Sequence, residues 1–165
     1  MNKQSSLALL AGFGLALLAL QCNQQQKPDT RAADEAAIRS INPAWFKAFN
    51  AGDANSIIAL YAEDAVVNAP GVPAARGQAA IREYFMKEVA AARAAGMTQN
   101  AGPTTDAGVS GDLGWEWGTY AAKDKSGATV DAGKYVTVYA KKDGKWLIIR
   151  DIWNSDGPMQ TPKAN

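Results

Sequence analysis

Residues 50–71, NAGDANSIIALYAEDAVVNAPG, carry in succession the signals for a tight turn, a short helix, a strand and a second turn. Gly52 suits the left-handed conformation that ends a helix, and Asp53 is a favoured cap for the helix that follows. We expect Ile57, Ile58 and Tyr61 to face inward from that short helix, and AVVNA to form a strand that ends at APGVP. This segment therefore joins a helical part of the chain to a sheet.

Amphipathic helices are predicted on both sides of this segment. From Ala32 onward, apolar residues recur at steps of three and four, which predicts a helix that ends at Gly52. Pro43 removes one hydrogen bond within it, so we expect a kink or a split after Asn42. A further helix is predicted for RGQAAIREYFMKEVAAARAAG, with Gly96 after its end.

The remainder of the chain is β in character. Residues 112–123, DLGWEWGTYAAK, alternate, so that Leu113, Trp115, Trp117 and Thr119 share one face, and Glu116 is expected on the outer face. The turns DKSG and KKDG lead into the strands ATVDAGKYVTVYA and KWLIIRDIW. Helices followed by an antiparallel meander predict an α+β domain whose helices cover one face of a curved sheet.

The N-terminal segment predicts export. Leu7–Leu20 is an apolar run too short to span a bilayer comfortably but typical of a signal peptide, which we assign to residues 1–21. The single cysteine, Cys22, follows directly, and LALLALQC resembles a bacterial lipoprotein signal in which the cysteine is lipidated. Gln21 departs from the Gly or Ala usual there, and ordinary secretion with cleavage after Ala19 is the alternative. Both interpretations place the chain outside the cytoplasm, in the periplasm or cell envelope.

Composition limits the organisation and the chemistry. Residues 22–31 form a predicted tether, residues 32–156 one domain and residues 157–165 a tail. Without Lys3, the basic and acidic side chains number 16 each, which gives no electrostatic case for binding nucleic acid. The sequence contains no histidine, which excludes Ser-His-Asp and Cys-His catalysis, and it offers no metal or cofactor motif. One cysteine allows no disulfide within the chain.

Three stretches resemble one known superfamily. FNAGDANSIIALYAEDAVV, RGQAAIREYF and GKYVTVYAKKDGKWLIIRDIWNSD together are similar to the SnoaL-like, nuclear-transport-factor-2-like superfamily, and in it to a subgroup of domains of unknown function. The resemblance covers residues 32–156. It implies a cone-shaped α+β barrel in which three N-terminal helices pack on a strongly curved antiparallel sheet, with an internal pocket. It also implies a homodimer formed through the outer face of the sheet.

The first half is similar to ketosteroid isomerase, another member of this superfamily. The isomerase mechanism requires a carboxylate base and an oxyanion hole made by a tyrosine and a protonated aspartic acid. The resemblance places Trp45 at the tyrosine, Ala69 at the base, and Tyr135 or Val136 at the second acid. Since none of these side chains is a carboxylic acid, we do not expect this isomerisation route.

The last strand decides what faces the pocket. The resemblance turns Leu147, Ile149, Asp151 and Trp153 inward and Trp146, Ile148, Arg150 and Ile152 outward, and a slip of one residue would exchange the two sets. Asp151 would then be the one acid in an aromatic cup. The side chains expected to line that cup are Trp45, Tyr61, Tyr84, Trp115, Trp117 and Trp153.

Three functions remain open from the sequence. The first is a binding module that holds a small apolar or aromatic molecule and contacts the membrane only through its N-terminal lipid. The second is an enzyme of the isomerase, cyclase or dehydratase type with Asp151 as general base, as the resemblance to polyketide-cyclising members implies. The alternative interpretation, which we favour for Asp151 over catalysis, is a structural residue that fixes the sheet register. The third is a dimeric association domain without a ligand.

Overall fold

The computed structural model describes residues 29–157, apart from the side chains of residues 103–105. The helices are α1 (Arg31–Ala51), α2 (Ala54–Ile58) and α3 (Gly77–Ala95), and the strands are β1 (Tyr61–Asn68), β2 (Ala75–Arg76), β3 (Thr98–Ser110), β4 (Leu113–Lys123), β5 (Thr129–Lys142) and β6 (Lys145–Ser155). The predicted signal peptide, Cys22 and nearly all of the predicted tail lie outside the described residues. Within the described part of the chain, no helix combines the length and the hydropathy needed to cross a bilayer.

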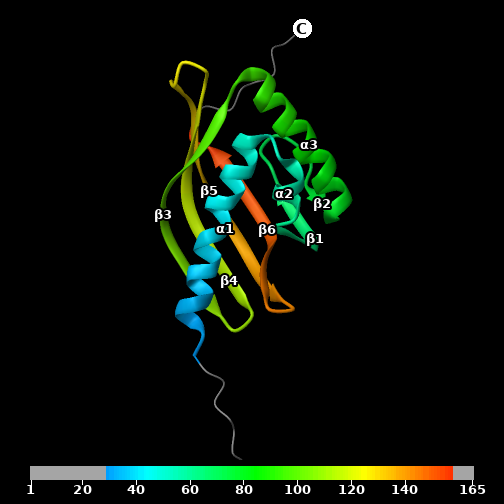
Figure 1. Ribbon diagram of the computed structural model, residues 1–165, viewed down its shortest axis with the longest axis vertical. Helices are drawn as coiled ribbons and strands as arrows, with labels where there is room; N and C mark the ends of the chain where they lie inside the picture. The colour runs from blue at the N-terminus through cyan, green and yellow to red at the C-terminus, as the bar shows by residue number, and fades with distance from the viewer. Residues whose placement is uncertain (1–28, 158–165) are drawn as a thin grey trace, which may run out of the picture.

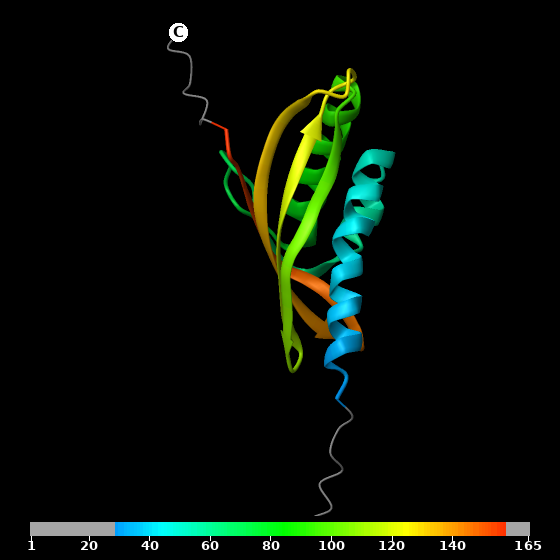
Figure 2. The same ribbon diagram turned by 90° about the vertical axis from the view of Figure 1, so that its left-hand side faces the viewer.

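The strands form one bent sheet in the order β2-β1-β6-β5-β4-β3. All neighbouring pairs are antiparallel except β1 and β6, which run parallel, so the sheet is mixed where an antiparallel sheet was expected. Helix α1 crosses the long strands, and α3 lies beside β1 and β2 (Figures 1 and 2). The three helices pack on one face of the sheet and enclose a hydrophobic core with it. This arrangement confirms the predicted α+β class.

Helix α1 continues through Pro43, so the predicted split after Asn42 is wrong. Apolar side chains on both sides of the proline, including Ile38 and Phe46, are buried, and this packing holds the helix together where one backbone hydrogen bond is missing. The end of the helix is as expected. Gly52 adopts φ 79°, and the next helix begins where Asp53 Oδ1 accepts a hydrogen bond from the backbone N–H of Ser56.

A buried carboxylate fixes the first turn of α1 to the far end of the sheet. Asp34 Oδ1 accepts hydrogen bonds from Lys141 Nζ at 2.7 Å and from Trp146 Nε1 at 2.9 Å. The Thr30 hydroxyl donates to Oδ2 at 2.6 Å. These donors, Lys141 foremost, lower the pKa of Asp34 to about 2, so the carboxylate stays ionised throughout the physiological range.

The face of β4 that points to the helices is not the one predicted. Leu113, Trp115 and Trp117 do share a face, but it is the outer one, where the two tryptophans are 41% and 37% exposed. Glu116, expected outside, is fully buried on the inner face. Its neighbours there are glycines. A Cβ at Gly114 would lie 2.3 Å from Ile38 Cδ1, so the inner face at this point has no room for a large side chain and the tryptophans must face outward.

An extra residue in β6 divides that strand into two alternation patterns. Arg150 pairs with Val138, whereas Ile148 pairs with the next residue along β5, so Ile149 has no partner there and forms a bulge. Trp146 and Ile148 therefore face the core before the bulge, and Asp151 faces inward after it. The expectation that Trp146 and Ile148 face outward is wrong, whereas the orientation of Asp151 agrees with it.

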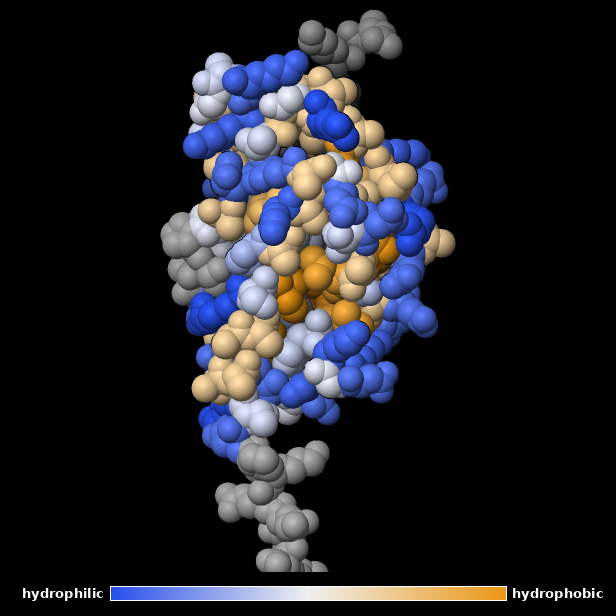
Figure 3. Space-filling view, viewed as in Figure 1, coloured by the Kyte–Doolittle hydropathy of each residue, from blue (hydrophilic) through white to orange (hydrophobic). Residues whose placement is uncertain are grey.

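The helix-bearing side of the molecule is mostly polar at its surface. Figure 3 shows hydrophilic side chains around most of the outline and a group of strongly hydrophobic side chains in a depression near the centre. The charged exposed residues of α3 account for part of the polar surface, as in the ion pair of 2.7 Å between Lys87 and Glu83. Apolar side chains are thus concentrated between the helices and the sheet.

Candidate functional site

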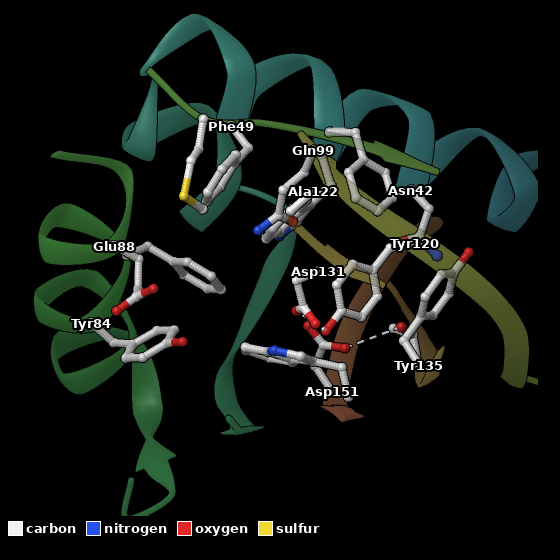
Figure 4. A pocket seen from close by; sticks show the side chains of 16 residues that line it. Asn42, Phe49, Tyr84, Glu88, Gln99, Tyr120, Ala122, Asp131, Tyr135 and Asp151 are labelled. Atoms are coloured by element: carbon white, nitrogen blue, oxygen red, sulfur yellow. Dashed lines mark hydrogen bonds between the residues drawn. The ribbon is translucent and has the colours of Figure 1, made fainter. Parts of the chain in front are cut away.

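A cavity of about 250 Å³ lies between α1, α3 and the inner face of the sheet (Figure 4). The residues around it come from both helices and from β3, β4, β5 and β6, and combine aromatic rings with polar ends. They are Asn42, Trp45, Phe46, Phe49, Tyr84, Phe85, Glu88, Met97, Gln99, Tyr120, Ala122, Asp131, Tyr135, Thr137, Asp151 and Trp153.

Asp151 is the deepest charged group in the cavity wall and is only 8% exposed. The Tyr61 hydroxyl donates to its Oδ2 at 2.6 Å, and the Thr137 hydroxyl donates to its Oδ1 at 3.2 Å. Tyr61 in turn accepts a hydrogen bond from Trp45 Nε1 at 3.2 Å, so a chain of donors runs from the indole to the carboxylate. Because the tyrosine oxygen receives the indole N–H, its own proton is directed at Asp151.

Burial sets the proton affinity of this carboxyl group. Removal from water raises the pKa of Asp151 from 3.8 to about 6, and the hydrogen bonds from Tyr61 and Thr137 only partly oppose this rise. Burial, and next the charge of Asp151, raises the pKa of Tyr61, which stays protonated. A carboxyl group with a pKa near 6 is able to exchange a proton close to neutral pH.

Aromatic rings form the wall facing Asp151. Trp45 stacks on Phe49 with ring centroids 5.2 Å apart and planes 12° apart, and it meets Phe85 edge-on at 5.7 Å. Tyr84 and Trp153 lie 6.2 Å apart in a tilted arrangement. These contacts hold the rings in fixed orientations, so the wall is rigid.

A second buried carboxylate lies behind this wall. Glu116 Oε1 accepts hydrogen bonds from Asn42 Nδ2 at 2.9 Å and from the Tyr135 hydroxyl at 2.8 Å. The Tyr139 hydroxyl donates to its Oε2 at 3.4 Å. Glu116 therefore positions two cavity-lining side chains, Asn42 and Tyr135, without lining the cavity itself.

The structure brings together some of the residues predicted for the pocket and separates others. Trp45, Tyr84, Trp153 and Asp151 line the cavity. Tyr61 is buried behind Asp151 and contacts it directly. Trp115 and Trp117 do not belong to the site, because the inner face of β4 is occupied by Gly114, Glu116 and Gly118.

Sequence reasoning missed several polar residues of the site on β4 and β5. Tyr120, Asp131 and Thr137 line the cavity. The resemblance allowed either Tyr135 or Val136 at the position of the second acid, and it is Tyr135 that lines the cavity. Val136 instead faces outward and is 40% exposed. The alternation of small and polar residues in GWEWG, with glycines in phase with Glu116, was the available signal for the inner face.

The site offers proton transfer and hydrogen bonding, and it lacks an evident metal centre. Within residues 29–157, no group of three or more potential metal-binding side chains lies close enough together to hold a metal ion. Carboxyl, hydroxyl and amide groups among aromatic walls are typical of a site that orients a small organic molecule.

Comparisons with known proteins place the chain in a family. Residues 43–149 match the SnoaL-like domain family. An NTF2-like protein with a cystatin-like fold from Novosphingobium aromaticivorans is 22% identical, with a TM-score of 0.70 over 78% of this chain and 86% of that chain. An NTF2-like protein of unknown function from Pseudomonas putida is 23% identical, with a TM-score of 0.70 over 81% and 94%.

A third solved structure, a ketosteroid isomerase-like protein from Erwinia carotovora atroseptica, is 22% identical with a TM-score of 0.59 over 76% of this chain and 98% of that chain. At these identities the likeness to solved structures shows a common fold. No curated protein matches the sequence significantly. The family match spans most of the chain, and the arrangement of helices on a bent sheet agrees with it. This chain therefore belongs to the SnoaL-like domain family.

Proposed function

We propose that this protein binds a small aromatic or apolar molecule in the cavity between α1, α3 and the sheet. The observation that carries the proposal is an aromatic-walled cavity with a buried carboxyl group, Asp151, in its wall. Rings provide apolar contact area, and the few polar groups fix the orientation of a ligand. Protein cores are close-packed, with few voids larger than a water molecule. A cavity of about 250 Å³ is therefore more space than the packing of a core leaves.

The volume limits the ligand to a small molecule. An apolar cavity of about 150 Å³ accommodates one benzene ring. The cavity of about 250 Å³ therefore fits a compound of one or two rings with a short polar substituent, and it is too small for a four-ring steroid.

A cavity-filling variant tests the binding proposal. Ala122 lines the cavity, whereas Ala121 precedes it on the same strand and faces the other side of the sheet. We expect Ala122→Phe to weaken binding of small aromatic compounds by more than about tenfold, because its ring occupies the ligand space. Ala121→Phe is the matched control and should bind as the wild type does. The measurement is ligand-observed NMR with a library of one- and two-ring compounds, and equal binding by both variants would contradict the proposal.

Catalysis at Asp151 is the second candidate function. It is favoured by one specific feature, the raised pKa of a carboxyl group that also lines the cavity. The group would act as general base on an acidic C–H of the ligand, as in an isomerase, cyclase or dehydratase. A suitable probe is 2-tetralone, whose α-hydrogens exchange with D₂O. Exchange that the wild type accelerates and Asp151→Asn does not would support catalysis, and equal rates would exclude this role for Asp151.

We also propose that the protein is exported, is lipidated at Cys22, and pairs with a second copy through the outer face of the sheet. The pairing is supported by apolar side chains that lie in register on three strands. Trp117 of β4 is opposite Val136 of β5, which is opposite Ile152 of β6, and all three are exposed.

Native mass spectrometry of the full chain purified from its host membrane tests the pairing and the lipid together. We expect a dimer whose subunits begin at Cys22 and carry a lipid. Trp117→Lys should give monomers, because a buried lysine at the centre of the contact has no partner. Val72→Lys, which places the same charge on an exposed apolar residue outside the outer face, should leave the dimer intact. A monomeric wild type, or subunits without a lipid, would refute the corresponding half of the proposal.

A further inference from the structure

All charged side chains that line the cavity are acidic. Glu88 from α3, Asp131 from β5 and Asp151 from β6 surround it, and no lysine or arginine is among the lining residues of the described chain. Figure 4 shows the carboxyl group of Glu88 beside Tyr84. Asp151 lies opposite Thr137 in the sheet, so Asp131 lies further along β5, towards its start. The space is thus bordered by negative charge from three separate elements.

Four hydroxyl groups beside the cavity donate hydrogen bonds to Asp131 and Asp151. Asp131 accepts hydrogen bonds from Tyr120, at 3.1 Å, and from Ser155. Asp151 accepts those of Tyr61 and Thr137. Neither carboxylate forms an ion pair with a described residue, so their charge is screened by neutral donors only.

The tyrosines in the wall respond to this charge. Burial first, and then the charges of Glu88 and Asp151, raises the pKa of Tyr84. Burial first, and then Asp131, raises the pKa of Tyr120. Burial is the larger cause in both cases and the nearby carboxylates add to it, so both tyrosines stay protonated.

The aromatic walls favour the same sign of ligand charge. The face of an indole or phenol ring is electron-rich and attracts a cation placed over it. Trp45 of α1, Tyr84 of α3 and Trp153 of β6 line the cavity, and one face of the Trp45 ring is stacked on Phe49. Two independent features, carboxylates without cationic partners and electron-rich rings, therefore coincide in one small space.

We propose that the ligand is a small aromatic amine in its protonated form, with its ammonium group directed to Asp151 and its ring held by the aromatic wall. This inference rests on the proposed function, because it names the ligand class of the same cavity. A neutral compound would gain no attraction from the charge of the carboxylates. An anion would lose its hydration and meet no cationic group among the described lining residues.

Three probes of similar shape and different charge test the inference. Tryptamine is a cation, tryptophol is neutral and indole-3-acetate is an anion. By isothermal titration calorimetry of the wild type at neutral pH, we expect tryptamine to bind about tenfold more tightly than tryptophol, and indole-3-acetate to bind most weakly. Tryptophol binding as tightly as tryptamine would overturn the charge preference and leave the proposed binding function standing. Failure of all three to bind at millimolar concentration would contradict both.

Charge-neutralising variants separate the cavity carboxylates from general surface charge. Glu88→Gln at the cavity should reduce the preference for tryptamine over tryptophol by about twofold. Glu83→Gln removes the same charge from the same helix at an exposed position away from the cavity, and it should leave the preference unchanged. Asp151→Asn should reduce the preference by about tenfold, because that carboxylate is more enclosed. Equal effects of Glu88→Gln and Glu83→Gln would assign the preference to overall charge and overturn the inference.

Discussion

Replacement of Glu116 with leucine is expected to lower the free energy of unfolding by about 3 kcal/mol. Glu116 is fully buried and accepts hydrogen bonds from Asn42, Tyr135 and Tyr139, three side chains that come from α1 and β5. Leucine fills similar space but accepts no hydrogen bond, so each of the three side chains loses one buried acceptor, and Asn42 keeps its hydrogen bond to the Tyr139 hydroxyl. Loss of this acceptor also releases Tyr135 and Asn42 from their positions in the cavity wall.

Glu116→Gln is the matched control for this prediction. Its amide oxygen still accepts from Asn42 and Tyr135, and its amide group is able to donate to the Tyr139 hydroxyl. We expect a loss of about 1 kcal/mol, well below that of Glu116→Leu. The measurement is urea-induced unfolding followed by circular dichroism. If leucine proved as stable as the wild type, the buried cluster would not contribute to stability, and the positioning role assigned to Glu116 would be wrong.

Local signals are sufficient to predict the order of the helices and the ends of α1 and α3. The end of the short α2 is not predicted, since Tyr61, expected in that helix, begins β1. Gly52 and Gly96 adopt positive φ angles of 79° and 66° and end α1 and α3, because a residue without a Cβ tolerates that conformation. The alternation of β4 was also evident in the sequence. These features depend on neighbours along the chain, so a single sequence contains the information.

The orientation of β4 and the bulge in β6 depend on tertiary packing. Alternation defines two sets of residues in β4 but does not decide which set faces inward, and hydrophobicity alone favoured Trp115 and Trp117 for the interior. The close approach of Ile38 to Gly114 reverses that choice. The bulge at Ile149 has no glycine or other local signal, and it arises where β6 must pair with β5 and β1 at once. Because the bulge lies between them, the inward orientation predicted for Asp151 agrees with the structure, whereas the outward orientation predicted for Ile148 is wrong.

Replacement of Asp151 with asparagine is expected to make the protein more stable at pH 8 by about 3 kcal/mol and to leave its stability nearly unchanged at pH 4. The pKa of Asp151 is raised from 3.8 to about 6 by burial, so ionisation of this group is less favourable in the folded chain than in the unfolded chain. Asparagine has nearly the same shape, offers one oxygen to Tyr61, and carries no charge at any pH.

The sign of the pH dependence follows from the direction of the shift. A carboxyl group whose pKa is higher in the folded state contributes its full stability below pH 3.8, and this contribution is lost as the pH rises through about 6. Asp34 acts in the opposite sense, since its pKa is lowered to about 2, and the stability it contributes is lost only as the pH falls below 3.8. The difference between wild type and Asp151→Asn in urea unfolding from pH 4 to pH 8 therefore isolates Asp151.

This pH dependence also separates the two interpretations of Asp151. If the carboxylate served only to fix the sheet register through Tyr61 and Thr137, asparagine would weaken those hydrogen bonds and destabilise the protein at every pH. A gain in stability at pH 8 would instead mean that the fold bears an energetic cost to keep an acid in the cavity wall. Such a cost is typical of groups retained for binding or catalysis, because selection for function tolerates it where selection for stability alone would not. A variant that becomes more stable while losing its preference for tryptamine would identify Asp151 as a functional group of the cavity.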